Sequence, residues 1–150
     1  MLKLLKNCDV YAPKHLGMRD ILLAGDKIMK VAEKIEGYEG LDGVEVMDLH
    51  GAIVTPGLID IHVHVTGGGG EQGYHSRTPE LNLSELIRSG VTTVLGLLGT
   101  DGTSRSLENL LGKVTALETE GISTYMLTGS YQYPTVTLTG SVLRDIMLID

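Results

Sequence analysis

Cysteine is almost absent from the sequence, since Cys8 is the only one in 150 residues. A lone cysteine excludes an intrachain disulfide framework and fits a reducing compartment, so we expect a cytoplasmic protein. Long apolar runs are also absent. The longest, residues 91–98, is short and interrupted by glycine, which argues against a membrane span, and residues 1–7 lack the apolar core of a signal peptide.

Positive charge is in deficit. The chain has 12 Lys and Arg against 19 Asp and Glu, a formal net charge of −7 and a pI near 5.1. No basic stripe is present to collect phosphates, which argues against a nucleic-acid partner or an anionic membrane surface. The composition therefore favours an intracellular enzyme over a binder of polyanions.

Up to about residue 57 the sequence alternates short β-type runs with turn residues. Residues 21–24 and 27–32 flank a Gly-Asp turn and predict a hairpin, and residues 44–49 and 52–54 predict further strands. We therefore predict that residues 1–57 form part of a small β-sandwich.

From residue 58 onward, strand and helix patterns alternate. Strands are predicted at residues 58–65, 91–98 and 122–128. Helices are predicted at residues 79–89, with either Asn82 or Thr78 as the cap, at 104–120 and from 141. The buried face of the longest helix is expected to carry Leu107, Leu110, Leu111, Val114 and Leu117. This alternation predicts an α/β fold with a parallel sheet.

Each predicted strand–helix unit takes roughly 30 residues, and eight such units make a (β/α)8 TIM barrel. The sequence shows no helix stop signal in residues 147–150. We therefore predict that residues 58–150 are the first three β/α units of an incomplete barrel and that the chain stops inside the last helix. The alternative is a small three-stranded α/β domain that is complete as given.

Residues 60–64 read Asp-Ile-His-Val-His within the first of these strands. Because side chains alternate between the faces of a strand, Asp60, His62 and His64 are predicted to share one face. The other face is predicted to carry Ile59, Ile61 and Val63. Two neighbouring imidazoles predict a metal site, although a single histidine in a strand is more often a hydrogen-bonded core residue. Asp60 is expected to be a buried acceptor that orients one imidazole.

Polar residues follow all three strands, at the edge where α/β barrels carry their catalytic groups. A run of four glycines leads to Glu71, Thr100 follows the second strand, and Tyr131 follows the third. Each also has a structural alternative. The glycines could form only a flexible loop, Thr100, Asp101 or Ser104 could cap the next helix, and Tyr131 could simply pack.

Residues 56–64 resemble the opening motif of the amidohydrolase superfamily, whose barrel holds one or two divalent metals. Four further segments resemble the isoaspartyl dipeptidase family of that superfamily, and residues 139–142 continue the match. These segments are residues 67–71, 77–80, 96–101 and 126–131. The resemblance covers essentially the whole chain and implies a metal-dependent TIM barrel preceded by part of a small β-sandwich.

The resemblance implies that His62 and His64 bind the more buried zinc of a pair of zinc ions. In the family, a carboxylated lysine bridges the two metals, and that lysine, two further histidines and a proton-carrying aspartate have no counterpart in residues 1–150. A hydroxide between the metals would attack the β-carbonyl amide. The resemblance also implies a homo-oligomer, an octamer in the family.

The resemblance further implies a small β-aspartyl dipeptide as substrate. Glu71, with the backbone of Gly69 and Gly70, would hold the free α-ammonium of the substrate, and Thr100 would bind its aspartyl end. Tyr131 would be catalytic, donating a hydrogen bond to the scissile carbonyl.

Two other functions remain open. Dihydroorotases and hydantoinases share the His-x-His strand, but dihydroorotases usually carry an arginine two residues after the second histidine, where this chain has Thr66. The other possibility is a truncated, non-catalytic chain. Because two imidazoles are only half of a four-coordinate zinc site, the 150-residue segment alone is expected to be inactive. The coding sequence beyond Asp150 would distinguish a dipeptidase, a cyclic amidase and a truncated chain.

Overall fold

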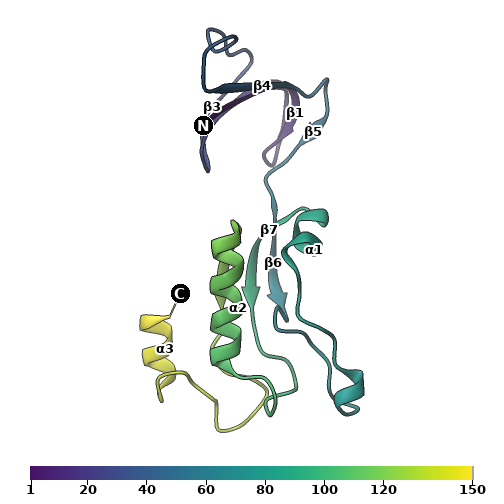
Figure 1. The fold of residues 1–150 in the computed structure, drawn as a ribbon, viewed down its shortest axis with the longest axis vertical. Helices are drawn as coiled ribbons and strands as arrows, with labels where there is room; N and C mark the ends of the chain where they lie inside the picture. The colour runs from purple at the N-terminus through teal and green to yellow at the C-terminus, as the bar shows by residue number, and fades with distance from the viewer. Residues whose placement is uncertain (150) are drawn as a thin grey trace. The chain divides into compact units, whose positions relative to one another are not determined.

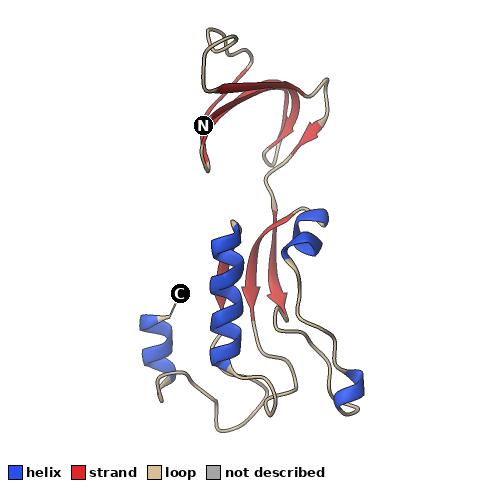
Figure 2. Cartoon of the chain, in the orientation of Figure 1, coloured by secondary structure: helices blue, strands red, loops and turns tan. Residues whose placement is uncertain are grey.

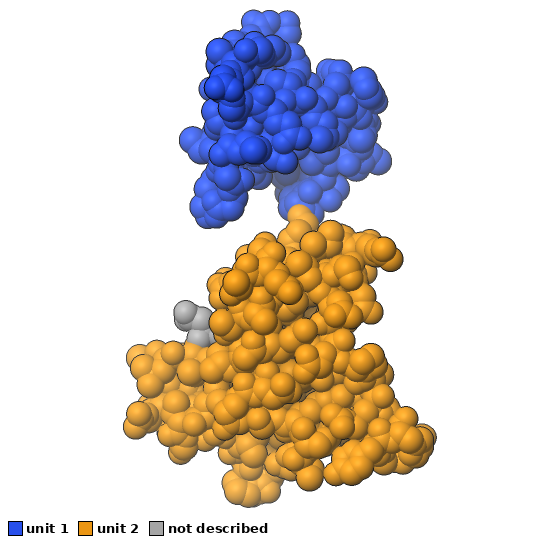
Figure 3. Space-filling model, viewed as in Figure 1, with its two compact units in different colours: residues 1–56 blue, residues 57–150 orange. Residues whose placement is uncertain are grey.

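The structure is a computed structural model that describes residues 1–149. The chain folds into two compact units, Met1–Pro56 and Gly57–Asp150 (Figure 3). No helix among the described residues is long and apolar enough to cross a membrane.

The first unit is a five-stranded sheet within residues 1–56, with strand order β3-β2-β1-β4 and β5 also paired to β1 (Figures 1 and 2). Its strands are β1 (Leu2–Tyr11), β2 (His15–Ala24), β3 (Lys27–Ala32), β4 (Val44–Asp48) and β5 (Ile53–Val54). The predicted hairpin is confirmed, because β2 and β3 pair antiparallel across Gly25, whose φ of 60° suits the tight turn. Both β4 and β5 run parallel to β1.

The sheet of the first unit buries two small apolar clusters. One is formed by Leu4, Leu22 and Ile35, and the other by Cys8, Val10 and Ile21. Burial raises the pKa of the Cys8 thiol, so this cysteine behaves as a small core residue.

The second unit is built on a three-stranded sheet with order β6-β7-β8 (Figure 1). Its strands are β6 (Leu58–Val63), β7 (Val91–Gly96) and β8 (Ser123–Met126). Its helices are η1 (Tyr74–Ser76), α1 (Leu83–Arg88), α2 (Leu107–Glu120) and α3 (Val142–Leu148). Both strand pairs are parallel, which confirms the predicted parallel sheet.

The helix α2 covers one face of this sheet. Its buried residues are Leu107, Leu110, Val114 and Leu117, which confirms four of the five predicted positions, while Leu111 is partly buried. The helix begins where the Ser106 hydroxyl accepts a hydrogen bond from the Asn109 N–H at 3.2 Å. It ends at Gly121, which is left-handed with φ 114°.

A boundary of each α-helix differs from prediction, and α2 begins at Leu107 rather than near residue 104. Helix α1 begins at Leu83 rather than near residue 79, because Asn82 and Glu85 form a capping box in which the Glu85 carboxylate accepts the Asn82 N–H at 2.8 Å. Helix α3 ends at Leu148, where Ile149 is already extended, so the expectation that the chain stops inside this helix was wrong.

Strand β6 departs from simple alternation. Its pairing with β7 shifts register between Asp60 and Val63. Val63 is 9% exposed and packs in the core with Val94, whereas Ile59 and Ile61 are 68% and 71% exposed. The prediction that Ile59, Ile61 and Val63 share one face was therefore wrong, because a register shift moves the following residues to the opposite face.

Asp145 of α3 anchors the loop that follows β8. Its buried carboxylate accepts hydrogen bonds from the Thr128 hydroxyl, from the Thr139 hydroxyl and N–H, and from the Leu138 N–H. Burial alone would raise the pKa of this carboxyl, but the hydrogen bonds from Thr128, Thr139 and Leu138 outweigh it and hold the pKa far below its usual range.

Replacing Asp145 by asparagine is expected to lower the Tm. The side-chain NH2 group of asparagine is a donor and would face the hydroxyl and N–H donors that the carboxylate now accepts. The folded pKa lies below the unfolded pKa of about 3.9, so the carboxylate stabilises the fold above that pH and loses this contribution as the pH falls through the folded value. Thermal unfolding between pH 3 and 7 should therefore show a smaller gap between parent and variant at the acid end. Asp42→Asn is the control, because it removes the same charge from an exposed position. An equal Tm in the two variants would contradict the role of Asp145.

Candidate active site

Three loops meet at one edge of the second unit. Because β6, β7 and β8 are parallel, their carboxyl ends lie together, and the segments that follow them leave from the same edge of the sheet (Figure 2). This edge carries the predicted site residues, one group from each loop.

His62 and His64 lie next to each other at the end of β6. Their ring centroids are 5.3 Å apart and the rings are nearly perpendicular, at 88°. The Nδ1 atom of His64 lies 3.2 Å from the Leu97 carbonyl oxygen. If Nδ1 donates that hydrogen bond, Nε2 carries the lone pair and is free to bind a metal.

The half-buried ring of His64 fits between two glycines. A Cβ on Gly68 would lie 3.3 Å from its Cδ2 atom, and a Cβ on Gly99 would lie 3.4 Å from its Cε1 and Nδ1 atoms. A Cβ at residue 68 would be tight against the imidazole, whereas a Cβ at residue 99 would make an ordinary van der Waals contact with it.

Asp60 does not have the predicted role. It is exposed, and its Oδ1 accepts a hydrogen bond from the backbone N–H of His62 at 3.1 Å rather than from an imidazole. The expectation of a buried acceptor that orients a ring was therefore wrong. The register shift that begins after Asp60 brings its carboxylate back onto the backbone.

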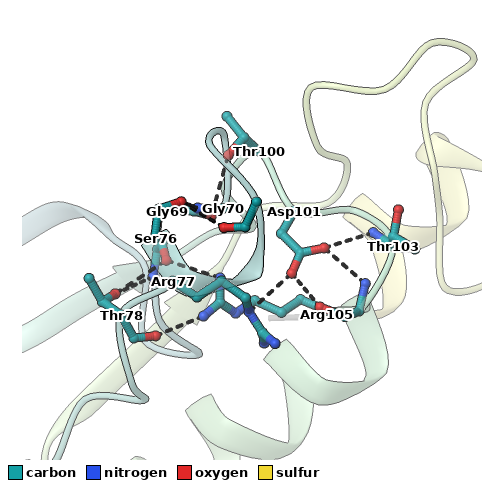
Figure 4. Close-up of polar contacts among 12 residues, drawn as sticks. Gly69, Gly70, Ser76, Arg77, Thr78, Thr100, Asp101, Thr103 and Arg105 are labelled. Carbon is teal, nitrogen blue, oxygen red and sulfur yellow. Dashed lines mark hydrogen bonds and ion pairs between the residues drawn. The ribbon is translucent and has the colours of Figure 1, made fainter.

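The structure brings Glu71 and Thr100 together from two different loops, and Figure 4 shows Thr100 close to Gly69 and Gly70. The Thr100 hydroxyl donates to Glu71 Oε1 at 2.8 Å and lies 3.4 Å from the Gly69 carbonyl oxygen. The Glu71 backbone N–H, the Thr100 hydroxyl and the nearby His64 together lower the pKa of the Glu71 carboxyl, so it is ionised at neutral pH.

Neither Thr100, Asp101 nor Ser104 caps the next helix, since the N-cap of α2 is Ser106. Asp101 instead accepts hydrogen bonds from the N–H groups of Thr103 and Ser104 and from the Ser104 hydroxyl. The Ser104 contacts are the main reason that the pKa of Asp101 falls to about 2. Its carboxylate also pairs with Arg77 Nε at 3.3 Å, which links the loop after β7 to the loop after β6.

Tyr131 is not brought to the other predicted residues. Its side chain is 76% exposed, and its hydroxyl makes no hydrogen bond within residues 1–149. It lines a cavity of about 220 Å³ with residues of the loops after β7 and β8. The packing alternative for Tyr131 is therefore wrong.

The imidazole pair fits a metal in part. Imidazole nitrogens are common zinc ligands, and the Nε2 of His64 suits that role when Nδ1 donates to Leu97. Within the described residues, no group of three His, Cys, Asp or Glu side chains is placed to hold a metal ion. Residues 1–149 therefore offer a metal two neighbouring imidazoles and no third ligand.

Sequence reasoning missed Arg105. Its side chain is buried, and its Nη1 and Nη2 atoms donate to the carbonyl oxygens of Gly68 and Thr78 at 3.1 and 2.8 Å. It lies just before the N-cap of α2, where an arginine is usually solvated, and neither spacing nor periodicity distinguishes it from a surface residue.

Comparison with known proteins shows the family to which the chain belongs. Residues 53–134 match the Amidohydrolase family, and the chain belongs to that family. In solved structures, the chain is similar to the β-aspartyl dipeptidase of Fervidobacterium islandicum AW-1. It is 51% identical, with a TM-score of 0.91, to the complex of that enzyme with β-Asp-Leu, and 52% identical, with a TM-score of 0.93, to a second structure of it.

Curated relatives include the dihydroorotase of Staphylococcus aureus strain MRSA252, which is 35% identical over 108 residues, 72% of this chain. The chain spans 24% of that relative. It covers 39% and 41% of the two dipeptidase chains, and all of it aligns with each. A D-hydantoinase structure, 20% identical with a TM-score of 0.58, shares the fold.

Proposed function

We propose that the protein is a zinc-dependent β-aspartyl (isoaspartyl) dipeptidase. The observation that carries the proposal is the Glu71–Thr100 pair, an ionised carboxylate held at 2.8 Å by a hydroxyl, close to His64. A fixed carboxylate beside a metal ligand suits the free α-ammonium of a peptide substrate. The similarity to a β-aspartyl dipeptidase structure containing β-Asp-Leu supports the same substrate class.

Each loop contributes a different contact to the proposed reaction. Glu71, with the backbone of Gly69 and Gly70, would hold the α-ammonium, and Thr100 would bind the aspartyl end. Tyr131 would donate a hydrogen bond to the scissile carbonyl and stabilise the negative charge that develops on its oxygen. The exposed position of Tyr131 leaves its hydroxyl available for that contact.

His62 and His64 would hold one of two zinc ions, with the remaining ligands, including a carboxylated lysine, outside residues 1–150. When bound, the metal lowers the pKa of water toward 7 and polarises the amide carbonyl. The contribution of this chain is orientation, because the Leu97 carbonyl lies 3.2 Å from Nδ1 of His64 and Gly68 leaves room for the ring.

The proposed function also sets the context of the fold. We assign residues 1–57 to part of a small β-sandwich and residues 58–150 to the first β/α units of a (β/α)8 barrel. The two compact units of the structure, which meet between Pro56 and Gly57, support this division. We further propose a cytoplasmic homo-oligomer, on the basis of the single cysteine and the family resemblance.

A cyclic amidase of the dihydroorotase type is the second candidate, because the curated relatives include dihydroorotases. The residue at the expected arginine position argues against it. Thr66 is 3% exposed, and its hydroxyl makes no hydrogen bond within the described residues. A short, enclosed side chain there is a poor substitute for an arginine that must reach a substrate carboxylate.

Substrate comparison with the complete protein tests the proposal. We expect hydrolysis of β-Asp-Leu and little or no hydrolysis of α-Asp-Leu, N-acetyl-β-Asp-Leu or dihydroorotate. Ring opening of dihydroorotate at a higher kcat/KM than β-Asp-Leu would select the second candidate. Equal rates for β-Asp-Leu and its N-acetylated form would exclude the role given to Glu71.

Residues 1–150 alone are expected to lack activity, because two imidazoles supply too few ligands for a catalytic zinc. The purified segment, assayed with excess zinc and β-Asp-Leu, should show no turnover above buffer. Turnover in the range of ordinary enzymes, about 1–1000 s⁻¹, would show that these residues hold a complete site.

A further inference from the structure

Arg105 is the most unusual charged residue in the second unit. Its side chain is 5% exposed, it makes no ion pair within residues 1–149, and its Nε has no hydrogen-bond partner there. Burying a guanidinium without a carboxylate is costly, and only its two contacts to backbone carbonyls offset that cost. We therefore expect an arginine buried at this cost to have a specific role.

The two carbonyls belong to the loop that carries Glu71. Arg105 Nη1 donates to Gly68 and Nη2 to Thr78. Gly68 and Thr78 are also bonded to each other, because the Thr78 N–H donates to the Gly68 carbonyl at 2.9 Å and the Gly68 N–H donates to the Thr78 hydroxyl at 2.7 Å. The guanidinium thus bonds to both ends of the segment 68–78 and holds them together, and Glu71 lies within this segment.

The backbone around Gly67 is shaped to receive the guanidinium. Gly67 has φ +88°, and a Cβ there would lie 2.6 Å from Arg105 Nη2 and 2.3 Å from the Thr78 carbonyl oxygen. A side chain at residue 67 would therefore displace Arg105. The adjacent Gly68 lies against the His64 ring. The bond from Arg105 to the Gly68 carbonyl therefore supports the backbone beside His64 as well as the segment that carries Glu71.

We propose that Arg105 is a positioning residue that sets substrate recognition by fixing segment 68–78, so that Glu71 faces the substrate's α-ammonium. The inference rests on the proposed function of Glu71. Arg105 reaches this segment from the loop that also supplies Thr100, the partner of Glu71, and Figure 4 shows Arg105 beside Thr78 of the segment. A planar guanidinium can hold two carbonyls at a fixed spacing, whereas a lysine ammonium lacks this fork.

The test is Arg105→Lys in the complete protein, which keeps the charge and loses the fork. KM for β-Asp-Leu should rise about tenfold, the lower end for one charge-assisted hydrogen bond, with kcat and zinc content near parental values. The preference for β-Asp-Leu over N-acetyl-β-Asp-Leu should fall by the same factor. Arg88→Lys, an exposed arginine at the end of α1, is the matched control.

A purely structural role gives a different result. In that case kcat falls with the active fraction, while KM and the preference for the free ammonium stay unchanged, and the inference is overturned. Amide hydrogen exchange adds a readout that needs no substrate. The Gly68 and Thr78 amides should exchange faster in Arg105→Lys, with the amides of α2 unaffected, and unchanged exchange would also overturn the inference.

A double variant separates this inference from the proposed function. In a Glu71→Gln background, Arg105→Lys should change KM by no more than about twofold, because the two residues act on the same contact. If Glu71→Gln alone leaves the ammonium preference intact, the proposed function fails. If Glu71→Gln abolishes the preference and Arg105→Lys leaves it intact, only the role of Arg105 fails.

A second pair of variants covers the case in which Arg105→Lys does not fold. Thr78 is exposed, so Thr78→Val removes its hydroxyl from Gly68 with little change in packing, and Thr78→Ser keeps the hydroxyl. Thr78→Val should raise KM as Arg105→Lys does, whereas Thr78→Ser should resemble the parent. Parental KM and parental ammonium preference in Thr78→Val would overturn the inference.

Discussion

Replacing His62 or His64 by alanine in the complete protein is expected to abolish tight binding of one zinc ion and to lower activity by orders of magnitude. The two rings lie 5.3 Å apart at the end of β6, and His64 is oriented through the Leu97 carbonyl. A catalytic zinc normally has three protein ligands and a water, so losing one imidazole leaves too few donors to hold the ion.

Elemental analysis of the purified variants measures this effect directly. His50→Ala is the control, because His50 is exposed and belongs to the first unit. Its zinc content should equal that of the parent. Full zinc occupancy in both His62→Ala and His64→Ala would rule out the metal assignment.

The second large effect is expected from Glu71→Gln, which removes the charge and keeps the shape. The loss of one charge-assisted contact should lower kcat/KM for β-Asp-Leu by roughly 10- to 150-fold, with zinc content unchanged. Because the pKa of the Glu71 carboxyl is lowered in the fold, this contact should persist as the pH falls to the carboxyl's ordinary value near 4.5.

Steady-state kinetics with β-Asp-Leu and its N-acetylated form check the prediction for Glu71. Glu118→Gln, an exposed change of the same type on α2, should leave both rates unchanged. The variant Glu71→Gln should show little difference between the two substrates. A parental preference for the free ammonium in Glu71→Gln would mean that another group binds it.

The sequence predicted the elements whose signals are local. The spacing of Leu107, Leu110, Val114 and Leu117 predicted the buried face of α2, and Gly121 predicted its end. Ser141 was correctly placed at the start of α3. For α1, the sequence left the cap open between Asn82 and Thr78, and the reciprocal bonds of Asn82 and Glu85 select Asn82.

Features that depend on pairing between distant segments were not predictable. The register shift in β6 depends on how it pairs with β7, so strict alternation placed Val63 on the wrong face. The Thr100 hydroxyl could bond either a helix end or a carboxylate 29 residues away, and only the fold selects Glu71. Arg105 gave no signal, because its partners are carbonyl groups, which every residue carries.

The carboxylate of Asp145 makes both ends of the segment after β8 depend on one side chain. Thr128 lies at one end of this segment and Leu138 and Thr139 at the other, and all three bond to Asp145 of α3. Residues 129–137, which include Tyr131, lie between these bonds, and Val136 also packs against the core. A change at Asp145 would therefore release both ends at once and is expected to shift Tyr131 without altering any residue of the segment itself.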